Sequence, residues 1–146
     1  MRVCGIEIKS NEAILCLMDM QDGLLQIPDC RQIRIPLLKD HDAESVRKFQ
    51  FIFRKLVEDY RIDTLVIKER MQKGKFAGSA IGFKIEAALQ LIESVKTELL
   101  SNSKQKEILK RNPLPIEFSA TGLKMFQEQA FITAYCFLMA AEYGLE

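Results

Sequence analysis

Two glutamates interrupt otherwise apolar segments and are the first candidates for a chemical role. Glu7 lies near the end of residues 3–8, on the face opposite its apolar neighbours, and a charge buried there requires a partner. Glu69 follows the apolar segment 64–67. If the two segments are adjacent strands, both carboxylates reach one place and supply the oxygen ligands that Mg²⁺ prefers. Two such ions about 3.5–4 Å apart can promote phosphodiester hydrolysis.

A third carboxylate, Glu128, lies at the start of the predicted last helix and is the only acid near enough in this plan to complete a catalytic set. A structural interpretation competes with the catalytic one. In it, Glu7 forms an ion pair with Lys9 or Lys68, and Glu69 is a surface charge just past a strand end. Such pairs are common and individually contribute little to stability. The acids alone leave both interpretations open.

The segment after Glu69 has a composition suited to phosphate. Arg70, Lys73 and Lys75 supply three cations, two glycines allow close approach of the backbone to a ligand, and the next helix would add amide donors at its N-terminus. A solvated loop without a ligand explains the same residues, because no Walker or dinucleotide fingerprint is present. Nucleic-acid binding by these cations is therefore one of two expectations.

The elements that must position these residues follow from the apolar pattern. Residues 3–8 and 13–18 flank a polar hairpin turn, and alternation over 32–37 predicts a third antiparallel strand. Apolar residues then recur every three or four positions over 46–60, which predicts an amphipathic helix. The β-branched segment 64–67 predicts a fourth strand.

The second half of the chain continues the alternation. Apolar residues spaced by 4, 3, 4, 3 and 4 predict a helix over 81–99, followed by a short helix within 101–111, a strand at 115–119 and a buried helix over 123–142. Right-handed crossovers then give an α/β fold whose five-stranded mixed sheet has helices on both faces. It combines a three-stranded antiparallel meander with two parallel strands. Sites in such sheets form at the carboxyl ends of strands where the strand order switches.

Composition narrows the class of protein. The 146 residues are enough for one core, so residues 1–146 are expected to form a single domain. The net charge of +1 provides no global field for a polyanion, and nucleic-acid binding would need a local basic patch.

The cysteines form no zinc motif and suit a reducing compartment. With no signal peptide and no apolar run of about 20 residues, we expect a cytoplasmic protein without membrane contact. An apolar helix stripe is compatible with a homodimer.

The chain resembles ribonuclease H-like proteins, in particular the RuvC type of Holliday-junction resolvase, and the likeness follows the element order across nearly the whole chain. It rests on Val3-Cys4-Gly5-Ile6-Glu7, on Val66-Ile67-Lys68-Glu69 and on Ser79-Ala80-Ile81. The resemblance implies that Glu7 and Glu69 bind catalytic metal ions. Where the resolvases carry two aspartates three residues apart on the last helix, this chain has Glu128, offset by one residue, and the neutral Gln129.

Two further motifs are similar to a small family called domain of unknown function 3010, namely Met1-Arg2-Val3-Cys4-Gly5 and Lys110-Arg111-Asn112-Pro113-Leu114-Pro115. That family implies no activity of its own, and a fold alone does not settle function. Two hypotheses follow from the sequence. The first is a nucleic-acid-associated, Mg²⁺-dependent nuclease with a RuvC-like carboxylate site. The alternative is a non-catalytic binding or assembly module that retains the fold but lacks a complete metal site.

Overall fold

A mixed sheet of six strands lies at the centre of the computed structural model, which describes residues 1–71 and 78–144. The strands are β1 (Arg2–Lys9), β2 (Glu12–Gln21), β3 (Leu24–Gln26), β4 (Arg34–Pro36), β5 (Thr64–Lys68) and β6 (Lys96–Leu100). Their order is β3-β2-β1-β5-β6, and β4 also pairs with β2. β2 runs antiparallel to its three partners, whereas β5 is parallel to both β1 and β6. The predicted mixed α/β sheet is confirmed.

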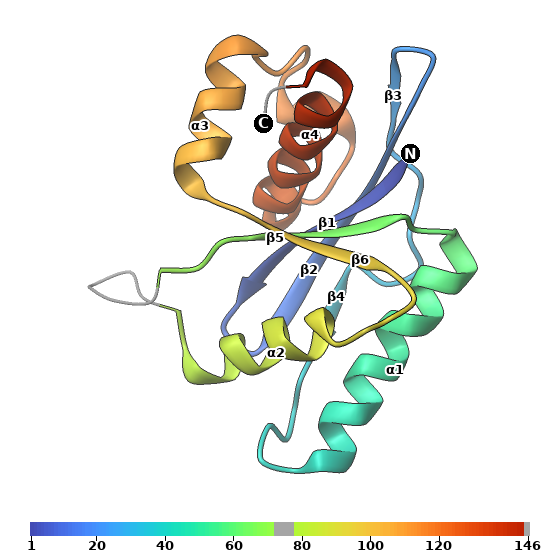
Figure 1. Cartoon of the computed structure of the whole chain (residues 1–146), viewed down its shortest axis with the longest axis vertical. Coiled ribbons are helices and arrows are strands. Elements are labelled where there is room, and N and C mark those ends of the chain that lie inside the picture. Colours follow the sequence, from blue (N-terminus) through green and yellow to red (C-terminus); the bar gives the residue numbers. More distant parts are fainter. Residues whose placement is uncertain (72–77, 145–146) are drawn as a thin grey trace.

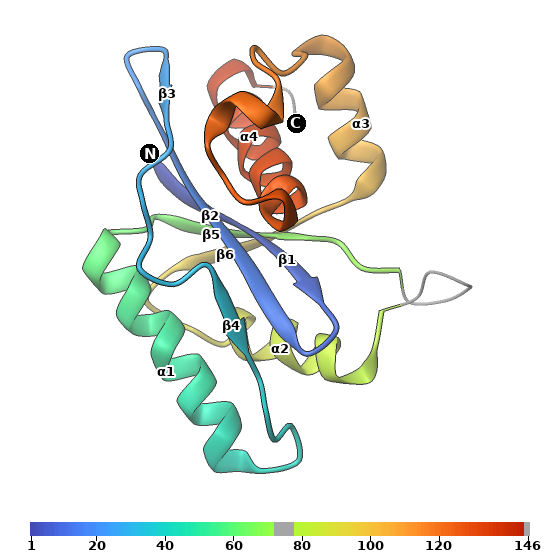
Figure 2. The same ribbon diagram turned by 180° about the vertical axis from the view of Figure 1, so that it is seen from behind.

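Helices cover both faces of this sheet, as predicted. They are α1 (Ala43–Tyr60), α2 (Ala80–Gln90), α3 (Asn102–Arg111) and α4 (Glu128–Tyr143). Figures 1 and 2 show α1 and α2 on one side and α3 and α4 on the other. Each side has its own apolar core, because alternate residues of β1 and β5 point to opposite faces. No helix within the described residues is long and apolar enough to cross a membrane.

Side-chain caps fix where the first three helices begin. Asp42, Ser79 and Ser101 each accept a backbone N–H from the first turn of α1, α2 and α3, respectively, which satisfies donors that the helix itself leaves unpaired. Ser101 directly follows β6, and Ser79 lies in the segment that connects β5 to α2. Both caps therefore place a helix N-terminus near the carboxyl ends of these parallel strands.

The last helix packs closely on the first strand through small residues. A Cβ atom at Gly5 would overlap the carbonyl oxygen of Ala130 and lie 2.8 Å from the Cβ of Ala134. Only glycine leaves room for the α4 backbone at this position. The first turn of α4 is consequently held beside the carboxyl half of β1.

The helix predicted over 81–99 is wrong in its second half, since α2 ends at Gln90 and β6 begins at Lys96. Ile92, Val95 and Leu99 continue the helical spacing of 3 and 4, although Ile92 and Val95 precede β6 and Leu99 lies within it. Parallel pairing with β5 decides the outcome. Leu99, predicted as part of the helical stripe, is 43% exposed.

The strand predicted at 115–119 is also wrong. Residues Phe118–Thr121 form a short 3₁₀ helix instead, and β6 takes the sheet position that this strand was expected to fill. The third predicted strand is shorter than expected, and β3 is an additional strand on β2. The short helix expected within 101–111 is confirmed as α3. The last helix begins at Glu128, after the 3₁₀ turn Met125–Gln127.

Candidate functional site

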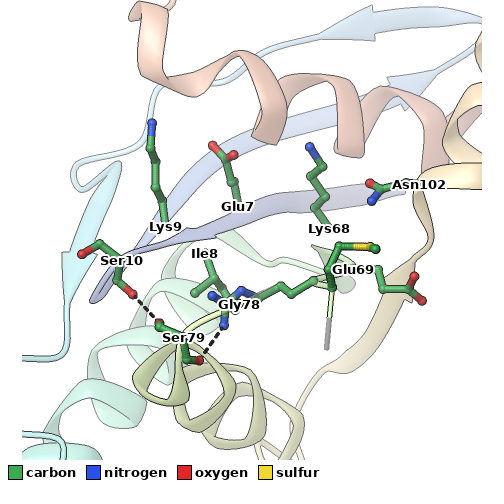
Figure 3. Close-up of a pocket in the computed structure, with 11 residues that line it drawn as sticks. Glu7, Ile8, Lys9, Ser10, Lys68, Glu69, Gly78, Ser79 and Asn102 are labelled. Carbon is green, nitrogen blue, oxygen red and sulfur yellow. Dashed lines mark hydrogen bonds between the residues drawn. The ribbon is translucent and has the colours of Figure 1, made fainter. Parts of the chain in front are cut away.

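The carboxyl ends of β1 and β5 open into a pocket of about 460 Å³. The two strands are parallel, with Gly5 opposite Val66 and Ile6 opposite Ile67, so their ends coincide as the sequence predicted. The polar residues of its lining come from β1, β5, the residues that follow these strands, the cap of α2 and the start of α3. They are Glu7, Lys9, Ser10, Lys68, Glu69, Arg70, Ser79 and Asn102. Figure 3 shows the pocket. Glu7 and Glu69 thus line one pocket, although they are far apart in the sequence.

The strand pleat separates the two glutamates within that pocket. The β1–β5 register ends with Ile6 opposite Ile67. Extending it by one residue places Lys68 beside Glu7, and extending it by a second residue places Glu69 beside Ile8. Because successive side chains point to opposite faces, Glu7 and Lys68 share the α4 side while Glu69 belongs to the α2 side. In Figure 3 the Glu7 and Lys68 side chains project in the same direction, and the Glu69 carboxylate points elsewhere.

The surroundings of Glu69 agree with this assignment. Glu69 is exposed and lines a second, smaller depression together with Phe83 and Glu86 of α2. Burial raises the pKa of Glu86, the Arg70 charge lowers it, and the Glu69 charge raises it further. Glu69 is therefore close enough to Glu86 of α2 to affect its pKa, on the opposite side of the sheet from Glu7.

Glu7 is half-buried, and burial is the main cause of a raised pKa at its carboxyl group. The positive charges of Lys68 and then Lys9 act in the opposite direction. Within the described part of the chain, Glu7 makes no direct ion pair with either lysine. The carboxylate therefore faces the pocket under the influence of two cations, without being neutralised by a contact.

Lys68 is held by the last helix. Its Nζ donates a hydrogen bond of 2.8 Å to Oε1 of Gln129, which lies in the first turn of α4. The side chain is half-buried, and its ammonium consequently lies between the carboxyl end of β5 and α4, on the same side of the sheet as Glu7. From the sequence, Lys68 is expected only as a possible counter-charge for Glu7.

These residues do not fit a carboxylate metal centre. Within residues 1–71 and 78–144, no group of three or more aspartate, glutamate, histidine or cysteine side chains is placed to hold a metal ion. Glu128 is exposed at the start of α4 and is not part of the pocket lining. Mg²⁺ needs several oxygen ligands in near-octahedral arrangement, whereas the Glu7 carboxylate has the Lys68 ammonium as its neighbour.

Of the three cations predicted to bind nucleic acid, Arg70 can be located. Its guanidinium lies 4.9 Å from the centre of the Phe83 ring, packs against Gly78 and Gly82, and donates from Nη1 to the Ser79 carbonyl at 3.4 Å. Burial lowers the Arg70 pKa. The side chain thus supports the start of α2 while it lines the pocket. Lys73 and Lys75 lie outside the described residues.

Asn102 and Ser10 of the pocket were missed from the sequence, and Ser79 was noted there only as part of the RuvC resemblance. Asn102 is the first residue of α3 and reaches the pocket because β6, which was not predicted, ends just before it. Ser79 caps α2, and its hydroxyl also lies 3.5 Å from the Ser10 carbonyl (Figure 3). A capping serine before each helix was a signal available in the sequence, but the position of β6 was needed to use it for α3.

The chain matches one protein family and is similar to solved structures at low sequence identity. A family described as protein of unknown function (DUF3010) matches residues 1–137. The structure of Thermus thermophilus RuvC is similar with a TM-score of 0.73 at 13% identity, covering 99% of this chain and 98% of that one. T. thermophilus RuvC in complex with Holliday junction substrate gives the same score and identity, covering 99% and 97%.

A viral protein also has a similar structure. The fowlpox virus Holliday junction resolvase has a TM-score of 0.51 at 5% identity, covering 100% of both chains. None of the curated proteins compared with the chain matches it. At these identities the similarity establishes a ribonuclease H-like fold of the RuvC type.

Proposed function

The chain belongs to the DUF3010 family, and from that premise we propose that its pocket binds the phosphate backbone of nucleic acid without cutting it. The observation that carries the proposal is the position of Lys68, whose ammonium lies on the same side of the sheet as Glu7 and is bonded to Gln129 of α4 at 2.8 Å. An ammonium at this point attracts phosphate and repels a divalent cation. The proposed protein is a binding module with a RuvC-type fold.

The remaining pocket residues support phosphate binding. Lys9 is exposed at the rim, and Asn102 adds a side-chain amide at the start of α3. The N-termini of α2 and α3 lie at the same end of the sheet, and helix N-termini favour negatively charged groups. The T. thermophilus RuvC structure with a Holliday junction substrate makes branched DNA the first ligand to test.

A Mg²⁺-dependent nuclease is the second candidate, and one observation favours it. Glu7 and Glu69 line the same pocket, so both could contribute to ion binding if the strand ends rearranged around a substrate. In this candidate Glu7 and Glu69 are the metal ligands and Glu128 is a third catalytic acid. Cleavage of a junction that requires Mg²⁺ and is lost in Glu7→Gln would favour it over the binding module.

Fluorescence anisotropy with a labelled four-way DNA junction in the presence of EDTA tests the proposal. Lys68→Met and Lys9→Ala should each weaken binding by roughly tenfold, because a charged hydrogen bond is lost. Each should also reduce the slope of log affinity against log salt by about one. Circular dichroism checks that the variants are folded.

Lys96→Ala provides the matched control. Lys96 is an exposed lysine that begins β6, so it lies at the opposite end of the strands from the pocket. Its removal should leave junction affinity unchanged. Equal losses in all three variants, or no binding by the wild-type chain in EDTA, would contradict binding at the pocket.

A further inference from the structure

We infer that Lys68 is a built-in cation that replaces a divalent ion in this pocket, and that two substitutions would convert the pocket into a metal site. The inference deepens the proposed function, on which it rests for the assignment of the pocket. Lys68 supplies permanently, as part of the chain, the positive charge that a bound ion would otherwise bring. Nucleic-acid binding would then be independent of the supply of metal ions.

The position of the ammonium carries the first step. The RuvC resemblance implies ligands from the first strand and from the last helix. Here those two elements are held together by the close contact of Gly5 with Ala130. Lys68 lies on the α4 side of the sheet, as Glu7 does, and its Nζ is 2.8 Å from the Gln129 side chain. It is near enough to Glu7 that its charge opposes the rise in the Glu7 pKa caused by burial. A cation is thus present where ligands from both elements would converge.

The chemistry of the two neighbours carries the second step. Gln129 offers a neutral carbonyl oxygen, which suits an ammonium donor but provides no charge for Mg²⁺. Glu7 is the sole carboxylate on this side among the described lining residues of the pocket. One carboxylate beside an ammonium carries no net negative charge, so a divalent cation gains little by entering. The pair Lys68 and Gln129 therefore excludes the ion jointly.

The converting substitutions follow directly. Lys68→Met removes the ammonium while keeping the apolar stem, and Gln129→Glu adds a carboxylate at the side chain that Lys68 contacts. The double variant should bind one Mn²⁺ per chain, with an affinity at least about tenfold above that of the wild-type protein. Electron paramagnetic resonance of free Mn²⁺ and isothermal titration calorimetry measure this without reference to any activity. Adding Glu7→Gln to the double variant should abolish the gained site.

Gln129→Glu alone is the matched control. With Lys68 retained, the new carboxylate should pair with the ammonium, and Mn²⁺ affinity should stay at the wild-type level. The inference is overturned if the wild-type protein already binds Mn²⁺ in a manner lost in Glu7→Gln, or if the folded double variant binds no better than the single one. Thermal melts of each variant establish that it is folded before titration.

Failure of this inference is distinguishable from failure of the proposed function. Metal binding by the wild-type protein would reject the role of Lys68 as a substitute ion, even if the junction still bound in EDTA. Loss of all junction binding in EDTA would reject the proposed function, even if the double variant gained a metal site. The two measurements therefore report on separate steps.

Discussion

Three neighbouring residues, Glu7, Lys68 and Gln129, determine the chemistry of the pocket. The sequence identified Glu7 correctly as an anomaly, since it is a half-buried acid at the end of an apolar strand. It also identified Gln129 as a neutral residue where the RuvC resemblance implies an acid. The contact between Lys68 and Gln129 could not be predicted, because it depends on how far α4 is displaced along β1.

The raised pKa of Glu7 makes a prediction about stability. Burial raises this pKa from its ordinary value of 4.5, so the folded chain retains the proton at pH values where the unfolded chain releases it. Stability from this group is fully present below pH 4.5 and is lost as the pH rises through the raised pKa. Glu7→Gln should therefore increase the free energy of unfolding at neutral pH and change it little in acid.

Urea denaturation at several pH values measures this difference. Glu93→Gln, which changes an exposed carboxylate, is the control and should shift the free energy of unfolding by no more than about 0.5 kcal/mol at any pH. An effect of Glu7→Gln that is the same at neutral and acid pH would show that burial does not govern the proton affinity of Glu7.

At the scale of elements, the end of each parallel strand and the start of the following helix build the site. The change of period from strand to helix is visible in the sequence, which is why β1, β2, α1 and β5 could be predicted. The boundary between α2 and β6 could not, because Ile92, Val95 and Leu99 continue the helical spacing past the residue at which α2 ends. Pairing with β5 is a tertiary effect that local spacing does not record.

The close contact between β1 and α4 predicts contrasting effects of two glycine substitutions. Gly5→Ala places a methyl group against the backbone of Ala130, which cannot move without shifting α4, and should cost about 1–3 kcal/mol of stability. Gly82→Ala meets only the end of the Arg70 side chain. That side chain can turn away, and the gain in helix propensity of up to about 1 kcal/mol offsets the lost contact.

Thermal or chemical denaturation of both variants checks this contrast. Junction binding adds a second readout, since a displaced α4 would also move Gln129 away from Lys68. Equal stability of Gly5→Ala and the wild-type protein would mean that α4 is not held against β1 as described.

For the whole molecule, the topology could be predicted but the register could not. Alternating strands and helices after a meander are typical of a mixed sheet with covered faces, and the RuvC-type fold follows. Whether Lys68 or Glu69 lies beside Glu7 depends on a shift of one residue between β1 and β5, which reverses the side-chain faces. The register therefore decides whether the Glu7 carboxylate has an ammonium or a second carboxylate beside it in the pocket. The net charge of +1 provides no global attraction for polyanions, so binding would depend on local groups such as those of the pocket.

We propose that the folded chain binds nucleic acid through its own ammonium groups and needs no divalent ion. The most direct test compares the affinity of the wild-type protein for a labelled four-way junction in EDTA and in Mg²⁺, with gel analysis of the recovered DNA. We expect the DNA to remain intact in both conditions. Binding in EDTA should be at least as tight as in Mg²⁺, because Mg²⁺ competes for the phosphates. Binding that appears only with Mg²⁺, or cleavage that Mg²⁺ induces and Glu7→Gln abolishes, would contradict it.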